Sequence, residues 1–598
     1  MDSHDTIEHD VLIIGAGGAG LRAAIAVAQA GLSVGVVCKS LLGKAHTVMA
    51  EGGIAGALGN LDTKDNWQVH FMDTMKGGQF LNNWRTVEIL AKEAPERVLE
   101  LEQWGAVFDR TPDGLIMQRP FGGHSYRRLS HVGDRTGLEL IRTLQDKAVS
   151  TGMKCYMETT ITRLLKDGER VVGAFGYNRE TGRFFAIKAK AVVLATGGWG
   201  RMYKVTSNSW ESTGDGAILA YEAGADLLGM EMVQFHPTGM VWPPGVRGLL
   251  VTEGVRGEGG VLRNGKGERF MFDPKYMTAL YKGKFAETEE EAARWLTDKA
   301  NNRPPPELLP RDVVARAIYR EVLAGNGTEH GGVYLDVTHR GADFIKRKLP
   351  SMYEQFHALG DVDITKEPME IYPTIHYTMG GVQAEPETAE TTLPGLYAAG
   401  ETSAGVHGAN RLGGNALCDI LVFGKRAGEA AAEYSRQVEH GAIDEAELRQ
   451  EAASLLAPFE SPGTENPYLL TQELQAAMQK GAMIARTEEG LTKCLQQVLE
   501  LQERAKNLHI EGSRLYNPGW HTARDILNML KVSEIIVRCA LERKESRGAQ
   551  WRLDYPNLDP EWAKKNLIAT KDGDKVKITT RPVPEMPPEL AKLFEEKK

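Results

Sequence analysis

The chain opens with a unit that strongly favours a nucleotide-binding α/β fold. Residues 10–14, DVLII, form a short apolar run typical of a buried parallel strand. An alanine-rich helix is expected over residues 21–30 and a second strand over residues 33–37. Between the first strand and the helix lies GAGGAG, which supplies Gly15, Gly17, Gly18 and Gly20. This order predicts that a pyrophosphate binds at the helix N-terminus.

The end of the second predicted strand departs from the pattern of nicotinamide dehydrogenases. An Asp or Glu is expected there to hold the ribose hydroxyls. This chain has Cys38, Lys39 and Ser40 instead. Lys39 therefore indicates a different adenosine environment, and a nicotinamide dehydrogenase would be unusual with this ending.

Composition excludes several classes of partner. The net charge of -9 and pI near 6.0 give no reason to expect nucleic acid or an anionic membrane surface. No CxxC pair occurs, which argues against a disulfide framework and against a metal or iron–sulfur site held by cysteines, and favours a reducing compartment. The start is polar and acidic, unlike a signal peptide, and no apolar run approaches the ~18 residues of a spanning helix. Any membrane attachment is therefore expected through other subunits. The five cysteines are Cys38, Cys155, Cys418, Cys494 and Cys539.

A second glycine-rich stretch, GETSAGVHGANRLGGNAL, spans residues 400–417 and contains Arg411. Glycine lets the backbone approach a ligand closely, and an arginine fork among backbone N–H groups can clamp a carboxylate. Taken alone, a solvated arginine in a flexible loop is the commoner outcome. The carboxylate clamp becomes the favoured interpretation when the other motifs are included.

Ordered motifs along nearly the whole chain resemble the succinate dehydrogenase and fumarate reductase flavoprotein family. They are HT…GG at 46–53, QRPFGG at 118–123, DRTG at 134–137, TGG at 196–198, TGDG at 213–216, QFHPTG at 234–239, TEGVRGEGG at 252–260, PRDVV at 310–314 and HYTMGG at 376–381. This resemblance implies FAD bound covalently through His46 at its 8α carbon. It departs from the family at Lys44-Ala45, where Arg-Ser is usual, and at Ala416, where Ser is common. The other implied FAD contacts are Gly15, Gly17, Gly18, Gly20, Lys39, Thr47, Gly53, Thr196, Gly197, Asp215, Glu401, Ala416 and Leu417.

The resemblance also implies a dicarboxylate site. His236 and Thr252 would bind one carboxylate, His376 and Arg411 the other, and Phe121 would help to wall the site. Arg311 would be the catalytic acid or base, with Glu253 and Arg256 as a proton relay. By spacing alone, Arg311 is an ordinary first-turn arginine, and Glu253, Arg256 and Glu258 form an exposed ion-pair cluster. We expect His124 and His131 to be surface polar residues and no metal site in this chain.

The expected fold is α/β: a Rossmann-like FAD-binding domain interrupted by an α+β capping domain, followed by a helical domain and a small C-terminal domain. The boundaries are 1–239 and 373–429 for the FAD-binding domain, 240–372 for the capping domain, 430–546 for the helical domain and 547–598 for the C-terminal domain. The helical domain is expected to form a solvated bundle without chemistry.

The implied activity is oxidation of succinate to fumarate, with electrons passing to an iron–sulfur subunit, membrane anchor subunits and quinone. The expected place is the cytoplasmic face of the inner membrane, held there by these partners. Fumarate reduction is an alternative, because Glu51 resembles the reductase version of its motif, where many dehydrogenases have Gln. A soluble L-aspartate oxidase-like flavoenzyme and a non-catalytic FAD scaffold also remain open.

Overall fold

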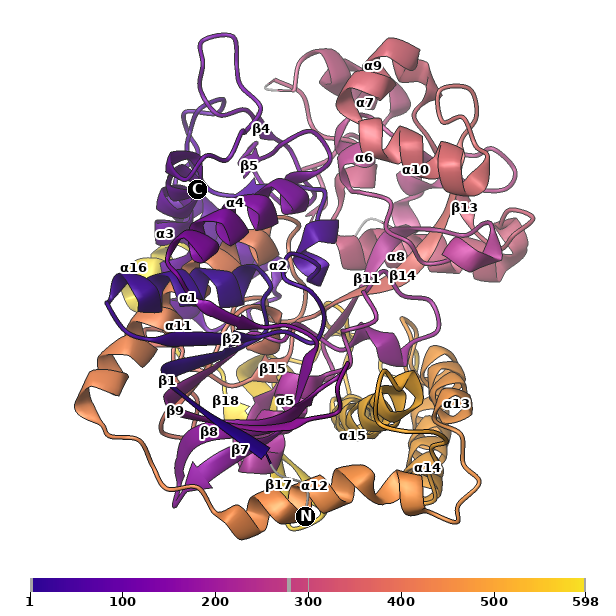
Figure 1. Cartoon of the computed structure of the whole chain (residues 1–598). Helices are drawn as coiled ribbons and strands as arrows, with labels where there is room; N and C mark the ends of the chain where they lie inside the picture. Colours follow the sequence, from indigo (N-terminus) through magenta and orange to yellow (C-terminus); the bar gives the residue numbers. More distant parts are fainter. Residues whose placement is uncertain (1–3, 277–280, 300, 596–598) are drawn as a thin grey trace.

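The computed structural model describes residues 4–276, 281–299 and 301–595 and has mixed α/β architecture. Its largest sheet contains seven strands (Figure 1). They lie in the order β6 (Lys154–Tyr156), β2 (Val34–Val37), β1 (His4–Ile14), β9 (Phe184–Leu194), β8 (Arg170–Asn178) and β7 (Thr159–Asp167), with β16 (Leu396–Ala398) beside β9. The neighbours β6, β2, β1 and β9 run parallel to one another, and β16 is parallel to β9. Strand β8 is antiparallel to both of its neighbours, β9 and β7.

The apolar run of β1 is continuous because both faces of the strand are buried. Val11 and Ile13 belong to the core under α1 (Gly18–Gln29) and α11 (Asn415–Gln437), whereas Leu12 and Ile14 belong to the core on the opposite face. The predicted strand, glycine turn, helix and second strand are therefore confirmed, although β1 begins earlier than expected, at His4.

A second sheet carries the segment expected to form the cap. Its order is β11 (Val233–Met240), β14 (Met369–Thr378), β13 (Val333–Asp336) and β12 (Val261–Arg263), all antiparallel. It packs with α8 (Arg311–Glu321) and α10 (Pro350–Gly360) around a core drawn from residues 240–371. Strand β14 also forms an isolated bridge between Ile375 and Thr206, in the segment that follows β9 of the large sheet.

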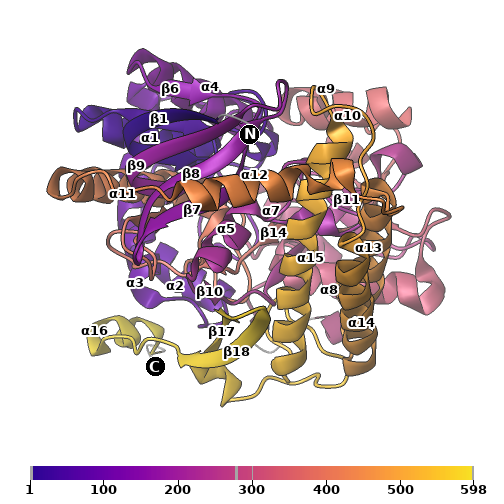
Figure 2. The ribbon, with the colours of Figure 1, turned by 60° about the horizontal axis from the view of Figure 1, so that its bottom comes forward.

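The helices after α11 are not an isolated bundle. They are α12 (Glu445–Glu460), α13 (Pro467–Gly481), α14 (Glu488–Ala505) and α15 (Pro518–Glu542). Figure 2 shows α12 lying across the antiparallel strands and α13 to α15 side by side. Trp520 of α15 stacks on Tyr177 of β8 with 4.1 Å between ring centres. The bundle therefore shares a core with the large sheet and can place side chains beside it.

The last part of the chain also joins the main body. Strand β17 (Lys565–Asp572) pairs with β18 (Lys575–Pro582) and with β10 (Leu227–Leu228). The predicted domain division remains a proposal. Its boundary at 429/430 falls inside α11, so we propose that the helical domain begins after Gln437.

Candidate functional site

One elongated cavity runs from the first βαβ unit to the inner ends of β11 and β14. Its volume is about 1600 Å³, including the space open to solvent at its mouth. All the residues predicted to bind or react line it, except Gly20 and Arg256. A Cβ at Gly20 would stand 1.8 Å from the carbonyl oxygen of Gly15, so Gly20 allows the turn to close. Arg256 lies behind Glu253.

Two helix N-termini open into this cavity. Helix α1 begins after Gly17 and α11 after Gly414, and neither has a side-chain cap or an acidic residue in its first turn. Both glycines, together with Ala416 and Leu417, line the cavity. The unpaired N–H groups of such helix ends attract negative charge. The cavity thus fits a cofactor that carries a pyrophosphate at one end and becomes electron-rich at the other.

At the α1 end, Lys39 lies between two carboxylates. Its Nζ is 3.0 Å from Asp215 Oδ2 and 2.6 Å from Asp525 Oδ1, and all three side chains are largely buried. Burial raises the pKa of Asp525. Burial also acts to raise the pKa of Asp215, but Lys39 and then Asn528 outweigh it, so the pKa of Asp215 is lowered. Asp525 belongs to α15, so the helical domain does contribute to the site. Nothing in the sequence marks this residue, because it lies 486 positions from Lys39.

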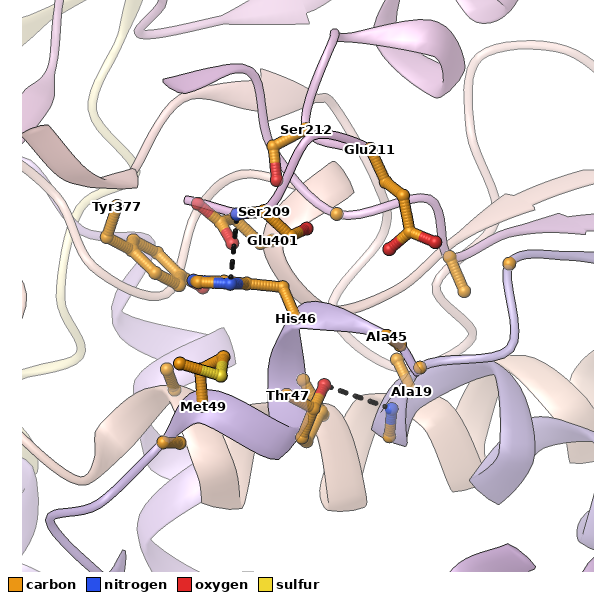
Figure 3. Close-up of a pocket in the computed structure, with 18 of the residues that line it drawn as sticks. Ala19, Ala45, His46, Thr47, Met49, Ser209, Glu211, Ser212, Tyr377 and Glu401 are labelled. Carbon is orange, nitrogen blue, oxygen red and sulfur yellow. Dashed lines mark hydrogen bonds between the residues drawn. The ribbon is translucent and has the colours of Figure 1, made fainter. Parts of the chain in front are cut away.

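His46 begins a short 3-10 helix, η1 (His46–Met49), in the middle of the cavity (Figure 3). The backbone N–H of Ser209 donates to its Nδ1 at 3.3 Å, and the amide of Asn208 lies 3.2 Å from its Nε2. Burial lowers the pKa of His46 to about 4. The ring is therefore neutral near pH 7. The next residue, Thr47, accepts a hydrogen bond from Gly18 N at 3.3 Å and so ties this helix to the glycine turn.

Strands β11 and β14 bring His236 and His376 together with 5.0 Å between ring centres. Thr238 bonds to Nδ1 of His236, and Ser207 Oγ lies 2.9 Å from Nδ1 of His376. In the described part of the chain, no hydrogen bond reaches Nε2 of either ring. Burial, and then the charge of Arg311, lowers the pKa of His236 well below its usual range. Burial, and then the neighbouring His236, does the same to the pKa of His376. Both are neutral imidazoles with Nε2 available to a ligand.

Arg411 is a buried cation that lacks a counterion. Its side chain donates no hydrogen bond to any residue in the described ranges, and the guanidinium carbon lies 4.1 Å from the ring centre of Tyr377. Burial, and then the charge of Arg311, lowers its pKa to about 9. A buried charge without a partner is costly. Its presence at the cavity indicates that an anion, such as a carboxylate, completes this site.

Arg311, Glu253 and Arg256 form a buried chain of charges. Arg311 Nε donates to Glu253 Oε2 at 2.8 Å, and Arg256 Nη2 lies 3.5 Å from the same oxygen. Burial acts to raise the pKa of Glu253, but Arg311 and then Arg256 lower it, so the group is a carboxylate. The predicted exposed ion-pair cluster is therefore wrong for Glu253 and Arg256. Arg311 is the first residue of α8, as predicted, but it is buried rather than solvated.

The prediction that His124 and His131 are surface residues is also wrong. His131 is buried, and its Nδ1 lies 3.1 Å from Asp109 Oδ2. His124 is partly buried and bonded to the glycine-rich loop. The local sequence before each ring, Pro-Phe-Gly-Gly for His124 and Arg-Arg-Leu-Ser for His131, carries no information about these contacts with Gly413 and Asp109.

Glu51 offers a test of the electrostatics of the cavity. Its Oε2 is buried without a hydrogen-bond partner among the described residues, and burial, then Asp134, raises its pKa well above the usual value. The folded protein then holds a proton that the unfolded chain releases above about pH 4.5. We expect the free energy of unfolding of wild type, relative to Glu51→Gln, to fall as pH rises from 5 to 8. Urea titrations of both holoproteins at pH 5, 6.5 and 8 check this, and parallel pH curves would contradict it.

Comparison with known proteins agrees with this geometry. The family model for the FAD binding domain matches residues 10–417, and the model for the fumarate reductase flavoprotein C-term matches residues 471–592. One subunit of the fumarate reductase (CoM/CoB) from Methanothermobacter marburgensis is 44% identical over 571 residues, covering 94% of this chain and 97% of that protein. The succinate dehydrogenase flavoprotein subunit of Rickettsia bellii is 35% identical over 606 residues, covering 97% of this chain and 96% of that protein. This chain belongs to the succinate dehydrogenase and fumarate reductase flavoprotein family.

A solved structure extends this result. Mycobacterium smegmatis Sdh1 in complex with UQ1 contains a chain 52% identical to this one, with a TM-score of 0.85 over 99% of this chain and 97% of that chain. The predicted family and fold class are confirmed, and the protein is an FAD-dependent oxidoreductase. Across residues 4–276, 281–299 and 301–595, no helix has both the length and the apolar character needed to cross a membrane. The same residues contain no cluster of three or more metal-ligating side chains.

Proposed function

We propose that this protein is the catalytic flavoprotein subunit of a succinate dehydrogenase, interconverting succinate and fumarate. The observation that carries the proposal is the buried Arg411, unpaired among the described residues, which lines the same cavity as His236, Thr252 and His376. Succinate is a dianion with a carboxylate at each end, so it needs two clamps. A scaffold protein that only holds FAD would have no use for them.

Each clamp combines different donors. Arg411 supplies charge for one carboxylate and can reach it with two parallel N–H groups, while neutral His376 adds a donor. His236 and the Thr252 hydroxyl bind the other carboxylate. The oxygen of this hydroxyl accepts from Gly254 N at 3.2 Å, so its hydrogen remains available to the substrate. Holding both ends fixes the central carbons of the substrate and lowers the entropic part of the barrier. Phe121, 3% exposed, walls the site against water.

Proton transfer falls to Arg311. FAD, when bound, supplies the two-electron acceptor for succinate oxidation. Succinate oxidation removes a hydride from one central carbon, which FAD would accept, and a proton from the other, which neutral Arg311 would take. In fumarate reduction, protonated Arg311 would deliver a proton to one central carbon while the other receives the hydride. Because arginine strongly favours its charged form, Glu253 and Arg256 are needed to carry the proton onward. Their buried chain leads away from the cavity and supports this relay.

The direction in the cell depends on partner subunits. We infer an iron–sulfur subunit that passes electrons to membrane anchor subunits and quinone, which would hold this chain at the cytoplasmic face of the inner membrane. The Mycobacterium smegmatis relative was solved in complex with UQ1, which supports a quinone-linked complex. Fumarate reduction remains the alternative, since Glu51 and the reductase-named relatives favour it.

Turnover with an artificial electron acceptor tests this function. We expect the purified, FAD-loaded protein to bleach a dye when succinate is added and not when L-aspartate is added. Bleaching with L-aspartate alone would indicate the soluble oxidase-like alternative. Absence of bleaching with either compound, in protein that still holds FAD, would support the scaffold.

We further propose that FAD is attached covalently through His46. His46 lines the cavity with a neutral ring, and a ring nitrogen can form a covalent bond once it gives up its hydrogen bond to Asn208 or Ser209, which supports this assignment. Denaturing gels of acid-treated protein should show flavin fluorescence in the protein band, lost completely in His46→Ala but kept in His9→Ala, a buried histidine outside the cavity. Flavin released from fully loaded wild-type protein would contradict the linkage.

A further inference from the structure

His124 and Arg128, which do not line the cavity, form a hydrogen-bonded network with the glycine-rich loop of residues 400–417. His124 Nε2 lies 2.7 Å from the carbonyl oxygen of Gly413, and Arg128 Nη1 lies 3.3 Å from His124 Nδ1. A guanidinium can only donate, so Nδ1 must accept. The proton of the neutral ring is then on Nε2, and His124 donates to Gly413. Arg128 thus stabilises the Nε2–H tautomer of His124, which is the one that can donate to the carbonyl oxygen of Gly413.

Arg128 is itself fixed in place. It is 0% exposed, with Nη2 at 2.8 Å from Asp65 Oδ1 and Nη1 at 2.9 Å from Asp73 Oδ2. Burial, and then Arg128, lowers the pKa of His124 to about 3. The ring is therefore neutral throughout the pH range of an enzyme assay, and the donor to Gly413 O does not change its protonation in that range.

Gly413 occupies a crowded point of the loop. A Cβ there would stand 2.5 Å from Phe121, 3.0 Å from Arg311 Nη2 and 3.0 Å from Glu253 Oε2. Arg311 and Glu253 therefore occupy the space where a side chain at position 413 would stand. A small movement of this residue would displace them.

The same loop also sets the start of α11. Gly414 precedes the helix, and Asn415 is held from the side opposite the cavity by His70 Nε2 at 2.9 Å from Oδ1. The free N–H groups of the first turn face the cavity with Ala416 and Leu417. Two histidines therefore anchor the loop where it passes from the clamp to the helix.

We propose that His124 is a positioning residue for the dicarboxylate reaction, holding the Gly413 carbonyl so that Arg311 and the N-terminus of α11 face the cavity correctly. This inference rests on the proposed function. The positive end of α11 favours negative charge in the cavity, as develops when a flavin is reduced. Loss of the His124 hydrogen bond should therefore affect both proton transfer and the reduction potential of bound FAD.

Three variants test this role. His124→Met removes the donor but keeps comparable volume, whereas His124→Gln can replace Nε2–H with an amide N–H. The matched control is His509→Met, which removes a similar ring-to-carbonyl bond, to Ser461 O at 2.8 Å, in the helical domain. We expect His124→Met to lower kcat about tenfold, with a smaller change in KM, as for the loss of one well-placed hydrogen bond. His124→Gln should restore most of the activity.

Two readouts do not depend on turnover. In His124→Met, amide hydrogen exchange in residues 412–417 should be about tenfold faster. The midpoint potential of bound FAD, measured by equilibration with a reference dye, should become more negative. Wild-type exchange and potential in a folded His124→Met protein would overturn the inference, as would equal effects in His509→Met. If wild type fails to react with succinate, the proposed function fails, but exchange and potential still decide the role of His124.

Discussion

Arg311→Ala should lower kcat for succinate oxidation and for fumarate reduction by about 10²–10⁴-fold, the range expected when a general acid–base group is removed. Arg311 is held by Glu253 at Nε and by Gln234 Oε1 at 3.2 Å from Nη1, which leaves Nη2 for the substrate. KM should change much less than kcat, because the clamps remain. Steady-state rates with a dye acceptor in both directions provide the measurement.

A control for this variant lies on the same helix. Arg320 of α8 is exposed and stacks on Trp551 with 5.0 Å to the ring centre. Arg320→Ala should therefore leave kcat within about twofold of wild type, as for an exposed residue that contributes little. If Arg311→Ala loses no more activity than Arg320→Ala, Arg311 is not the acid–base group.

Arg411→Met should weaken dicarboxylate binding by about 30- to 4000-fold, corresponding to the ~2–5 kcal/mol lost when one partner of a buried charge pair is removed. The same change should not lower the thermal stability of the substrate-free protein, and we expect it to rise. The reason is that wild type buries this charge without a partner when no anion is bound. Succinate titrations of flavin absorbance and thermal melts, each with and without ligand, measure the two effects separately.

Arg486→Met is the matched control for stability. Arg486 is also fully buried, but it donates to Met483 O at 3.1 Å, to Glu231 O at 2.8 Å and to Gln550. Its loss leaves buried neutral acceptors unpaired and should destabilise the protein by about 1–3 kcal/mol for each acceptor that finds no other partner. Equal destabilisation by Arg411→Met would show that Arg411 has a structural partner and would contradict the open carboxylate site.

The sequence predicts the local parts of this protein well. The first βαβ unit follows from a strand of apolar residues, a glycine turn and an alanine-rich helix, because each depends on neighbouring residues only. The start of α8 at Arg311 follows in the same way. The family resemblance then brings distant motifs to one cavity, which no local pattern could do.

Burial and long-range pairing account for the differences. Glu253, Arg256 and His131 lie in polar stretches that indicate surface, whereas His124 follows two glycines. Their contacts come from elsewhere in the sequence, such as Gly413 for His124 and Arg311 for Glu253. Asp525 reaches Lys39 because α15 packs on the antiparallel strands, and the amphipathic pattern of that helix carries no information about this contact. A long helix such as α11 also crosses a domain boundary placed by composition.

Anaerobic mixing of the FAD-loaded protein with succinate tests the central claim most directly, since it needs neither partner subunits nor dye. We predict that the flavin absorbance is bleached by succinate and recovers when excess fumarate is added. In Arg311→Ala, both phases should be slowed by about 10²–10⁴-fold. A bound flavin that stays oxidised with succinate, and that fumarate does not reoxidise after chemical reduction, would contradict the account.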